Sequence, residues 1–485
     1  MRDHILLYIN GRPHELRGAL AFISLSTFLR EHLHLTGTKI VCAEGDCGSC
    51  TVLLGRPATG TLVYRPVCSC IQYLFQLDCT HIITIEGLKY DGRLNPIQES
   101  MVRNHGAQCG FCTPGFVVSM AALLDADHPP TECTLRRGLV GNLCRCTGYE
   151  PILKAGLDTD TTALRPLDQL YDTTAIAANL ARHESEPVQL SADGRVLSKP
   201  VTLANACAFR AAHPDCLIVS GGTDLGVQAN KGLREFRTVL TTRGLRELDG
   251  LTMQDHSIIA GASTTIADLE AFAARHLPDY ARMLDLFGSP PVRNAGTLGG
   301  NIANGSPIGD TMPALLVLNA EVELAAPAGT RRVNINDFYT GYRKNVLQSD
   351  ELILRIRIPL PAAPHEVLKV YKVSKRKDLD ISTFTAAIWM RHAERRIDDV
   401  RIAYGGVAPT ILRLPRTEES LRGKPLDEAS FQRAGVVARG EIKPISDVRG
   451  AAEYRLRLAE NILPKFFADL VAPVMPRHSS NGKGA

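Results

Sequence analysis

The chain has 485 residues, of which 45% are hydrophobic and 22% charged, so it is long enough for several globular domains. The formal net charge is only +4 and no block of Lys and Arg is present, which argues against a nucleic-acid partner. No apolar run is long enough for a membrane helix, and the N-terminus becomes polar too early for a signal peptide, so we expect a cytoplasmic protein without a membrane partner.

The first elements predict a small domain built around a loop. Residues 4–17 alternate apolar and polar around Asn10-Gly11, which is a strong hairpin signal. A helix is expected near residues 24–35, and strands are expected at 51–54 and 82–85. Between them lies the glycine-rich stretch CAEGDCGSC. We therefore predict a domain over residues 1–88 that wraps this loop around a metal site.

Thirteen cysteines in a reducing compartment indicate metal ligands more than disulfides. Cys42, Cys47 and Cys50 have the C-x4-C-x2-C spacing of plant-type ferredoxins, in which a fourth thiolate completes a [2Fe–2S] site. Cys68 and Cys70 both compete for the fourth position. The alternative is a structural zinc site with four cysteine ligands, although interleaved glycines are unusual for one.

From about residue 94 the apolar residues recur at the spacing of an α-helix. Thr113 is predicted to cap a helix that begins at Pro114 and runs to residue 125, and a second helix is expected at 135–140. A second group of cysteines lies at the ends of these helices: Cys109, Cys112, Cys144 and Cys146. We predict a helical domain over residues 89–156 that holds another four-thiolate site, for which zinc is again the alternative. Two one-electron centres on one chain indicate a protein that conducts electrons.

Residues 157–198 are rich in Thr, Asp and Ala with weak periodicity, and we expect a linker there. From 199 to 361 strands and helices alternate around two glycine-rich stretches, at 220–225 and 294–310. Such stretches expose N–H groups that suit a diphosphate, but neither has the G-x-G-x-x-G pattern, and tight turns are the alternative explanation. Residues 362–475 are predicted to form a further domain of strands and helices, and 476–485 a disordered tail.

Several strings together resemble one enzyme family. CAEGDCGSC, QCGFCTPGFVVSM and GNLCRCTGY are similar to the iron–sulfur part of the xanthine dehydrogenase/molybdenum hydroxylase family, and VSGGTDLG, NAGTLGGNIANGSPIGD and YKVSKRKDLDIS are similar to its FAD domain. The resemblance covers about residues 4–472 and is strongest to the small subunit of bacterial xanthine dehydrogenases. It implies a multidomain α+β fold: a β-grasp ferredoxin-like domain, a helical-bundle [2Fe–2S] domain, an α+β FAD-binding domain and a C-terminal α+β domain like that of the CO dehydrogenase flavoprotein.

The resemblance also implies roles for individual residues. It assigns one [2Fe–2S] cluster to Cys42, Cys47, Cys50 and Cys70, and the other to Cys109, Cys112, Cys144 and Cys146. It places the FAD diphosphate on Ser220, Gly221, Gly222, Thr223, Asp224 and Leu225. Further FAD contacts are expected from Phe287, Thr297, Gly300, Asn301, Asn304, Ser306, Asp310, Ile353 and Lys372. A charged loop, residues 375–380, is expected near the flavin.

The function that the resemblance implies is that of an NAD-dependent xanthine dehydrogenase subunit, with no catalytic residue on this chain beyond its cofactors. Electrons from hypoxanthine or xanthine oxidation are expected to pass from molybdenum through two clusters to FAD and then NAD. No segment resembles the molybdopterin-binding portion, so a large partner subunit is expected to carry it, in a heterotetramer. The alternatives are the equivalent subunit of a hydroxylase for an aldehyde or N-heterocycle, a zinc protein with a nucleotide-sensing domain, and a stand-alone flavin reductase.

Overall fold

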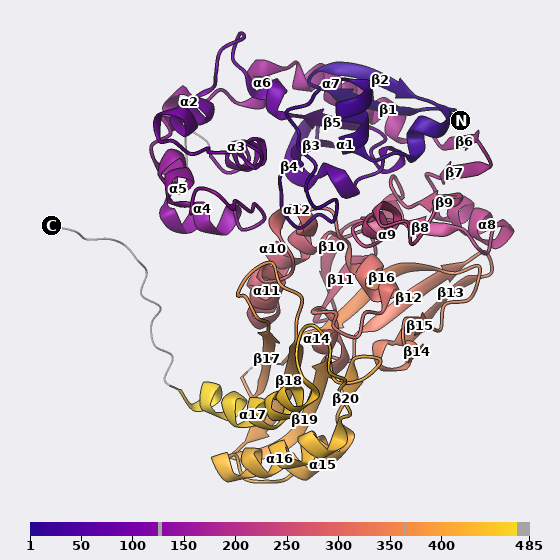
Figure 1. Ribbon diagram of the computed structural model, residues 1–485. Helices are drawn as coiled ribbons and strands as arrows, with labels where there is room; N and C mark the ends of the chain where they lie inside the picture. Colours follow the sequence, from indigo (N-terminus) through magenta and orange to yellow (C-terminus); the bar gives the residue numbers. More distant parts are fainter. Residues whose placement is uncertain (125–128, 363, 473–485) are drawn as a thin grey trace.

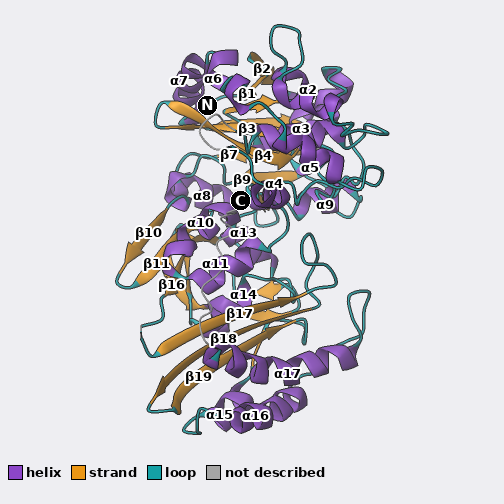
Figure 2. Ribbon diagram, turned by 90° about the vertical axis from the view of Figure 1, so that its left-hand side faces the viewer, coloured by secondary structure: helices purple, strands orange, loops and turns teal. Residues whose placement is uncertain are grey.

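The computed structural model describes residues 1–124, 129–362 and 364–472, and the domains follow one another in tiers (Figure 1). The N-terminal sheet and the small helical domain lie side by side at one end, and the C-terminal domain lies at the other (Figures 1 and 2). The predicted tail, 476–485, and the predicted last helical residue, 125, lie outside the described residues. Among the described helices, none combines the length and apolar character that a membrane crossing requires.

The N-terminal domain is a five-stranded mixed sheet in the order β2-β1-β5-β3-β4. Its strands are β1 (Ile5–Ile9), β2 (Arg12–Leu16), β3 (Thr51–Ala58), β4 (Thr61–Cys68) and β5 (Thr80–Ile83). The predicted hairpin is present, and Asn10 and Gly11 both have positive φ, as its tight turn requires. A short helix α1 (Leu25–Thr27) continues as a π turn, Phe28–His32, where a longer helix was predicted.

The helical domain contains four short helices: α2 (Pro96–Arg103), α3 (Thr113–Ala121), α4 (Glu132–Gly138) and α5 (Glu150–Leu157). Thr113 does not cap α3 as predicted: Cys112 occupies the cap position, and the buried Thr113 hydroxyl has no hydrogen-bond partner among the described residues. Helix α4 begins earlier than predicted because the Thr131 side chain accepts a hydrogen bond from the Thr134 N–H.

Residues 157–198 differ from the predicted linker. They contain helices α6 (Leu167–Leu170) and α7 (Thr173–Glu184), followed by strands β6 (Val188–Ala192) and β7 (Arg195–Lys199). Helix α7 buries Ile176, Ala177 and Leu180 against the N-terminal domain. Its few apolar residues are enough for a helix once a neighbouring surface covers them, which the weak periodicity did not reveal.

Three sheets and several helices form the middle tier, and the smallest sheet has two strands. Strands β6 and β7 continue into a four-stranded sheet in the order β6-β7-β9-β8, and a five-stranded sheet has the order β10-β11-β16-β12-β13. The strands are β8 (Leu217–Val219), β9 (Thr238–Thr241), β10 (Leu251–Gln254), β11 (Ser257–Gly261), β12 (Glu321–Ala326), β13 (Gly329–Asn334), β14 (Tyr339–Gly341), β15 (Lys344–Asn345) and β16 (Leu352–Pro359). The helices are α8 (Leu203–Ala212), α9 (Leu225–Asn230), α10 (Ile266–His276), α11 (Pro278–Asp285), α12 (Pro290–Arg293), α13 (Leu298–Asn304) and α14 (Met312–Val317).

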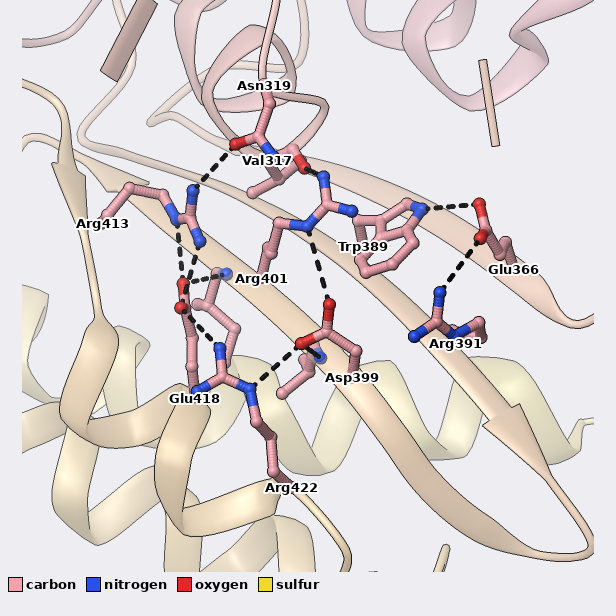
Figure 3. Close-up of polar contacts among 12 residues, drawn as sticks. Val317, Asn319, Glu366, Trp389, Arg391, Asp399, Arg401, Arg413, Glu418 and Arg422 are labelled. Carbon is pink, nitrogen blue, oxygen red and sulfur yellow. Dashed lines mark hydrogen bonds and ion pairs between the residues drawn. The ribbon is translucent and has the colours of Figure 1, made fainter. Parts of the chain in front are cut away.

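The C-terminal domain is an antiparallel sheet, β17-β18-β19-β20, with helices packed on it (Figure 2). The strands are β17 (Glu366–Val373), β18 (Phe384–Ala393), β19 (Arg396–Gly405) and β20 (Leu412–Arg413), and the helices are α15 (Pro415–Leu421), α16 (Glu428–Glu441) and α17 (Ala452–Val471). Arginines of this sheet reach the C-terminal end of α14, where carbonyl groups carry partial negative charge (Figure 3). Arg401 donates to the Val317 carbonyl at 2.7 Å, and Arg413 contacts the Asn319 side chain at 3.5 Å.

Candidate functional site

The first cysteine site lies on the loop before β3 and on the turn after β4. The thiols of Cys42 and Cys47 hydrogen-bond each other, as do those of Cys50 and Cys70, and Cys42 also contacts Cys70. These hydrogen bonds lower the pKa of Cys42 and raise that of Cys70. Cys68 also hydrogen-bonds Cys50, and its thiol donates to the Gly45 carbonyl at 3.4 Å, but Cys70 hydrogen-bonds both Cys42 and Cys50. The arrangement favours Cys70 over Cys68 as the fourth member of the site.

The second cysteine site joins the segment before α3 to the segment before α5. The Sγ atoms of Cys109 and Cys146 are 3.5 Å apart, and Cys112 hydrogen-bonds Cys144. Burial and the neighbouring Cys144 raise the pKa of Cys112 to about 12. Cys112 and Cys144 are buried, whereas Cys109 and Cys146 are exposed. Tyr149 helps to hold the backbone at Cys144 in place, because its hydroxyl accepts a hydrogen bond from the Cys144 N–H at 3.1 Å.

Among the described residues, no three Cys, His, Asp or Glu side chains converge on a position for a single metal ion. The thiols lie instead in pairs, and a two-iron cluster would take one such pair on each iron. Backbone N–H groups also approach the sulfurs: those of Glu44 and Thr147 lie 3.4 and 3.5 Å from Cys42 and Cys144, respectively. Such contacts compensate the negative charge of thiolates and tune a bound centre.

The two cysteine sites touch each other through their backbones. The Leu143 N–H, next to Cys144, donates to the Cys47 carbonyl at 3.0 Å. The Asn142 side chain donates to the Gly48 carbonyl at 3.2 Å. Gly48 has a φ of 68°, and a Cβ atom there would lie 2.3 Å from the Gly141 carbonyl oxygen, so glycine is required for this approach.

A cavity of about 380 Å³ opens between the two glycine-rich stretches of the middle tier, a volume in the range of cofactor sites. The first stretch follows β8 and enters α9, and the second leads into α13. The two approach closely: a Cβ atom on Gly221 would lie 2.1 Å from the Ala295 carbonyl oxygen. The Thr297 hydroxyl caps α13 by accepting from the Gly300 N–H at 3.2 Å.

Twelve of the fifteen residues predicted to contact FAD line this cavity: Ser220, Gly221, Gly222, Thr223, Asp224, Leu225, Phe287, Thr297, Gly300, Asn301, Asn304 and Ile353. The prediction did not include other lining residues, among them Ile218, Thr242, Leu248, Ser263 and Arg343. These belong to no motif and are brought in by the strand order. Backbone N–H groups of the glycine-rich stretches and an apolar wall with one aromatic ring fit a flavin that carries a diphosphate.

Ser306, Asp310 and Lys372 are not among the lining residues. The Lys372 ammonium pairs with the Asp310 carboxylate at 2.6 Å, and the Ser382 hydroxyl donates to the same carboxylate at 2.5 Å. Both charged side chains are buried, so they satisfy each other and join β17 to the end of the second glycine-rich stretch. The charged loop 375–380 does not line the cavity either: its Asp378 binds Arg137 of the helical domain at 3.0 Å.

Polar side chains connect the first cysteine site to the cavity. The Asn230 amide, at the end of α9, donates to the Cys70 carbonyl at 2.9 Å and to the Ala43 carbonyl at 2.8 Å. Gln72, two residues after Cys70, donates to the Gly221 carbonyl at 3.3 Å. The second cysteine site, the first cysteine site and the cavity therefore follow one another through direct contacts.

Comparison with known proteins identifies three of the domains. Residues 84–157 match a [2Fe-2S] binding domain, residues 191–361 the FAD binding domain in molybdopterin dehydrogenase, and residues 369–470 the CO dehydrogenase flavoprotein C-terminal domain. These matches confirm the predicted multidomain α+β fold. Among curated relatives, Arabidopsis thaliana xanthine dehydrogenase 2 is 30% identical over 95% of this chain, and Gallus gallus xanthine dehydrogenase/oxidase is 28% identical over 96%.

The chain spans about 39% of the length of these relatives. Among solved structures, a chain of carbon monoxide dehydrogenase from Hydrogenophaga pseudoflava has a TM-score of 0.53 and 28% identity. A chain of quinoline 2-oxidoreductase from Pseudomonas putida 86 has a TM-score of 0.53 and 27% identity. Each match covers 56% of this chain and 94% of the solved chain.

Proposed function

Because the chain combines the [2Fe-2S], FAD-binding and flavoprotein C-terminal domains of the molybdenum hydroxylases, we propose that it is the electron-transfer subunit of a heteromeric xanthine dehydrogenase. The chain carries electrons from the molybdenum centre of a large partner subunit through two [2Fe–2S] clusters to FAD and then NAD. The proposal includes a large molybdopterin-binding partner subunit, in a heterotetramer. We place the protein in the cytoplasm.

One observation carries the proposal: two four-thiol sites and a cofactor-sized cavity lie in direct succession. The Cys47 carbonyl bonds the backbone of the second site, and the Cys70 carbonyl bonds α9 at the edge of the cavity. Clusters held by these thiols supply one-electron steps, and FAD supplies the two-electron step that NAD requires. The chain's own residues contribute by holding the thiols in pairs and by fixing the distance between neighbouring sites.

Each part of the site has a defined task. The glycine-rich stretches present N–H donors to the diphosphate, and Phe287 provides an aromatic surface for the flavin ring. Cys112 and Cys144 are buried against the helices, whereas Cys109 and Cys146 face outward. The exposed pair is the side from which we expect electrons to arrive.

A second candidate is the equivalent subunit of a hydroxylase for another substrate. The structural similarity to carbon monoxide dehydrogenase and to quinoline 2-oxidoreductase favours it. The two candidates share the same cofactors and differ in the partner subunit. A panel of hypoxanthine, xanthine, an aldehyde, quinoline and carbon monoxide, given to the complex with its natural partner, distinguishes them.

The first test is an absorption spectrum of the purified chain with iron, zinc and flavin measured. About four irons and one FAD per chain, with a brown colour, support the electron-transfer function. A colourless chain that contains zinc and no flavin refutes it. Reduction of NAD by xanthine in the assembled complex then tests the substrate, and reduction by quinoline alone selects the second candidate.

A further inference from the structure

Helix α11 ends next to the flavin cavity. Its last residue is Asp285, and two residues later Phe287 contributes its ring to the cavity wall. Gly288 then takes a positive φ and turns the chain toward α12. The carbonyl groups in this last turn carry partial negative charge, so cations placed there stabilise the helix end. Whatever fixes this turn also fixes the position of the Phe287 ring.

Two arginines bind the turn from different domains. Arg293, which is buried, donates to the Asp285 carbonyl at 2.9 Å and to the Phe287 carbonyl at 3.1 Å. Arg137, on helix α4 of the helical domain, donates to the same Asp285 carbonyl at 2.8 Å and pairs with the Asp285 carboxylate. The turn is thus bound once from within its own domain and once from the domain that holds the second cysteine site.

The same guanidinium also reaches the C-terminal domain. Arg137 donates from its other terminal nitrogen to the Asp378 carboxylate at 3.0 Å, on the loop between β17 and β18. That loop is itself anchored, because the Lys375 ammonium donates to the Val448 carbonyl at 2.7 Å. Arginine suits this position because its planar fork offers donors in two directions at once. One side chain, two-thirds buried, joins three domains beside the flavin cavity.

We infer that Arg137 is a positioning residue for the flavin, acting through Asp285 and Phe287. The inference rests on the proposed function, because it assumes that FAD occupies the cavity. Without Arg137 the turn keeps its bonds to Arg293 but loses those to the helical domain and, through it, to Asp378. The Phe287 ring then has more freedom, and its contact with the flavin weakens.

The test compares two neighbouring arginines in the full chain with cofactors. Arg137→Ala is expected to raise the Kd for FAD about fivefold and to change the visible circular dichroism of bound FAD. The expected effect is small for a charge-assisted hydrogen bond because the Arg137 side chain is one-third exposed. Arg136→Ala is the control, since it removes the same charge from the same helix, and the ion pair of Arg136 among the described residues is with Glu132 on an exposed face. Arg136→Ala is expected to match the wild type in both measurements.

A double substitution separates positioning from a general loss of stability. In a Phe287→Ala background, adding Arg137→Ala is expected to change the Kd for FAD less than twofold, because the ring through which Arg137 acts is gone. A fivefold effect in that background overturns the inference, and so does Arg137→Ala with an unchanged Kd and flavin spectrum. Should Arg137→Ala fail to fold, Arg137→Lys keeps the charge but loses the fork, and an unchanged Kd and spectrum there also overturn it. A wild-type chain that binds no FAD refutes the proposed function instead.

Discussion

Asp78 is the residue whose substitution we expect to affect stability most. Its carboxylate is fully buried, and Arg2 binds both of its oxygens at 2.8 and 2.7 Å. The Lys199 ammonium, also buried, lies 2.5 Å away, and the Leu6 N–H donates at 3.0 Å. The group joins the N-terminal residues and β5 to strand β7 of the adjacent sheet. Asp78→Asn keeps the shape but removes the carboxylate that lies between two buried cations: Lys199 loses its ion pair, whereas Arg2 keeps the one with Glu186 at 2.9 Å.

The magnitude follows from this geometry. Burial by itself raises the pKa of Asp78, but hydrogen bonding and charge from Arg2 and Lys199 outweigh it and lower the pKa from 3.8 to about 2. That difference corresponds to about 2 kcal/mol of stability at neutral pH. Removing one partner of a buried ion pair costs about 3–5 kcal/mol, so we expect Asp78→Asn to destabilise the N-terminal domain by about 3 kcal/mol.

The sign of the pH dependence gives a second measure. A depressed pKa means that the folded state binds the proton less tightly than the unfolded state, so this contribution is complete above about pH 4 and is lost as the pH falls to about 2. The free energy of unfolding of the wild type is therefore expected to fall between about pH 4 and pH 2. That of Asp78→Asn is expected to fall less over the same range.

The assay is urea unfolding at pH 7 and at lower pH, followed by hydrogen exchange of the amides in β1 and β5, which reports on this domain alone. Asp3→Asn is the control, because Asp3 pairs with Arg17 on the exposed surface, and its removal is expected to change the midpoint little. If Asp78→Asn unfolds at the same urea concentration as the wild type, the buried pair does not hold these elements together.

Three further outcomes are expected. Cys112→Ser is expected to halve the iron content and stop NAD reduction by purine while FAD remains bound, as measured by metal and flavin analysis and a substrate assay; normal NAD reduction refutes the electron path. Gly48→Ala places a Cβ against a carbonyl oxygen of the helical domain and is expected to lower stability by about 2 kcal/mol more than Gly60→Ala, which has a similar positive φ but open space; equal melting temperatures contradict the contact. Arg401→Ala uncovers the single tryptophan, Trp389, whose ring lies 3.6 Å from the guanidinium, and is expected to shift its fluorescence to longer wavelength (Figure 3); an unchanged spectrum contradicts the stacking.

Features fixed by neighbouring residues could be predicted from the sequence. The Asn10-Gly11 hairpin follows from two residues that tolerate positive φ, and the spacing of Cys42, Cys47 and Cys50 places three thiols on one loop. The glycine-rich stretch 220–225 was assigned to a cofactor, and it lines the cavity. In each case a short segment carries the whole signal, so distant contacts cannot reverse it.

Features that depend on distant partners were missed. Helix α7 was expected as part of a linker, because its apolar face is narrow and becomes buried only against the N-terminal domain. The ion pair of Lys372 with Asp310 was not expected either: a buried ammonium needs a counter-charge, and the sequence does not show which carboxylate supplies it. The role of Arg137 has no sequence signal at all, since its partners Asp285 and Asp378 are far away in the chain.

The order of the two cysteine sites and the cavity in space also depends on contacts between residues that are distant in the sequence. The contacts that join these sites involve the backbone carbonyls of Cys47, Cys70 and Gly221. Because every residue has a backbone carbonyl, the residue type does not show which of them accept such hydrogen bonds. The donors are ordinary residues, such as Asn230 and Gln72, whose importance depends on where the chain places them. A chain that kept every cysteine but lost these donors would retain its thiol pairs while loosening the spacing between them. The electron path that we propose therefore depends on the residues between the motifs as well as on the motifs themselves.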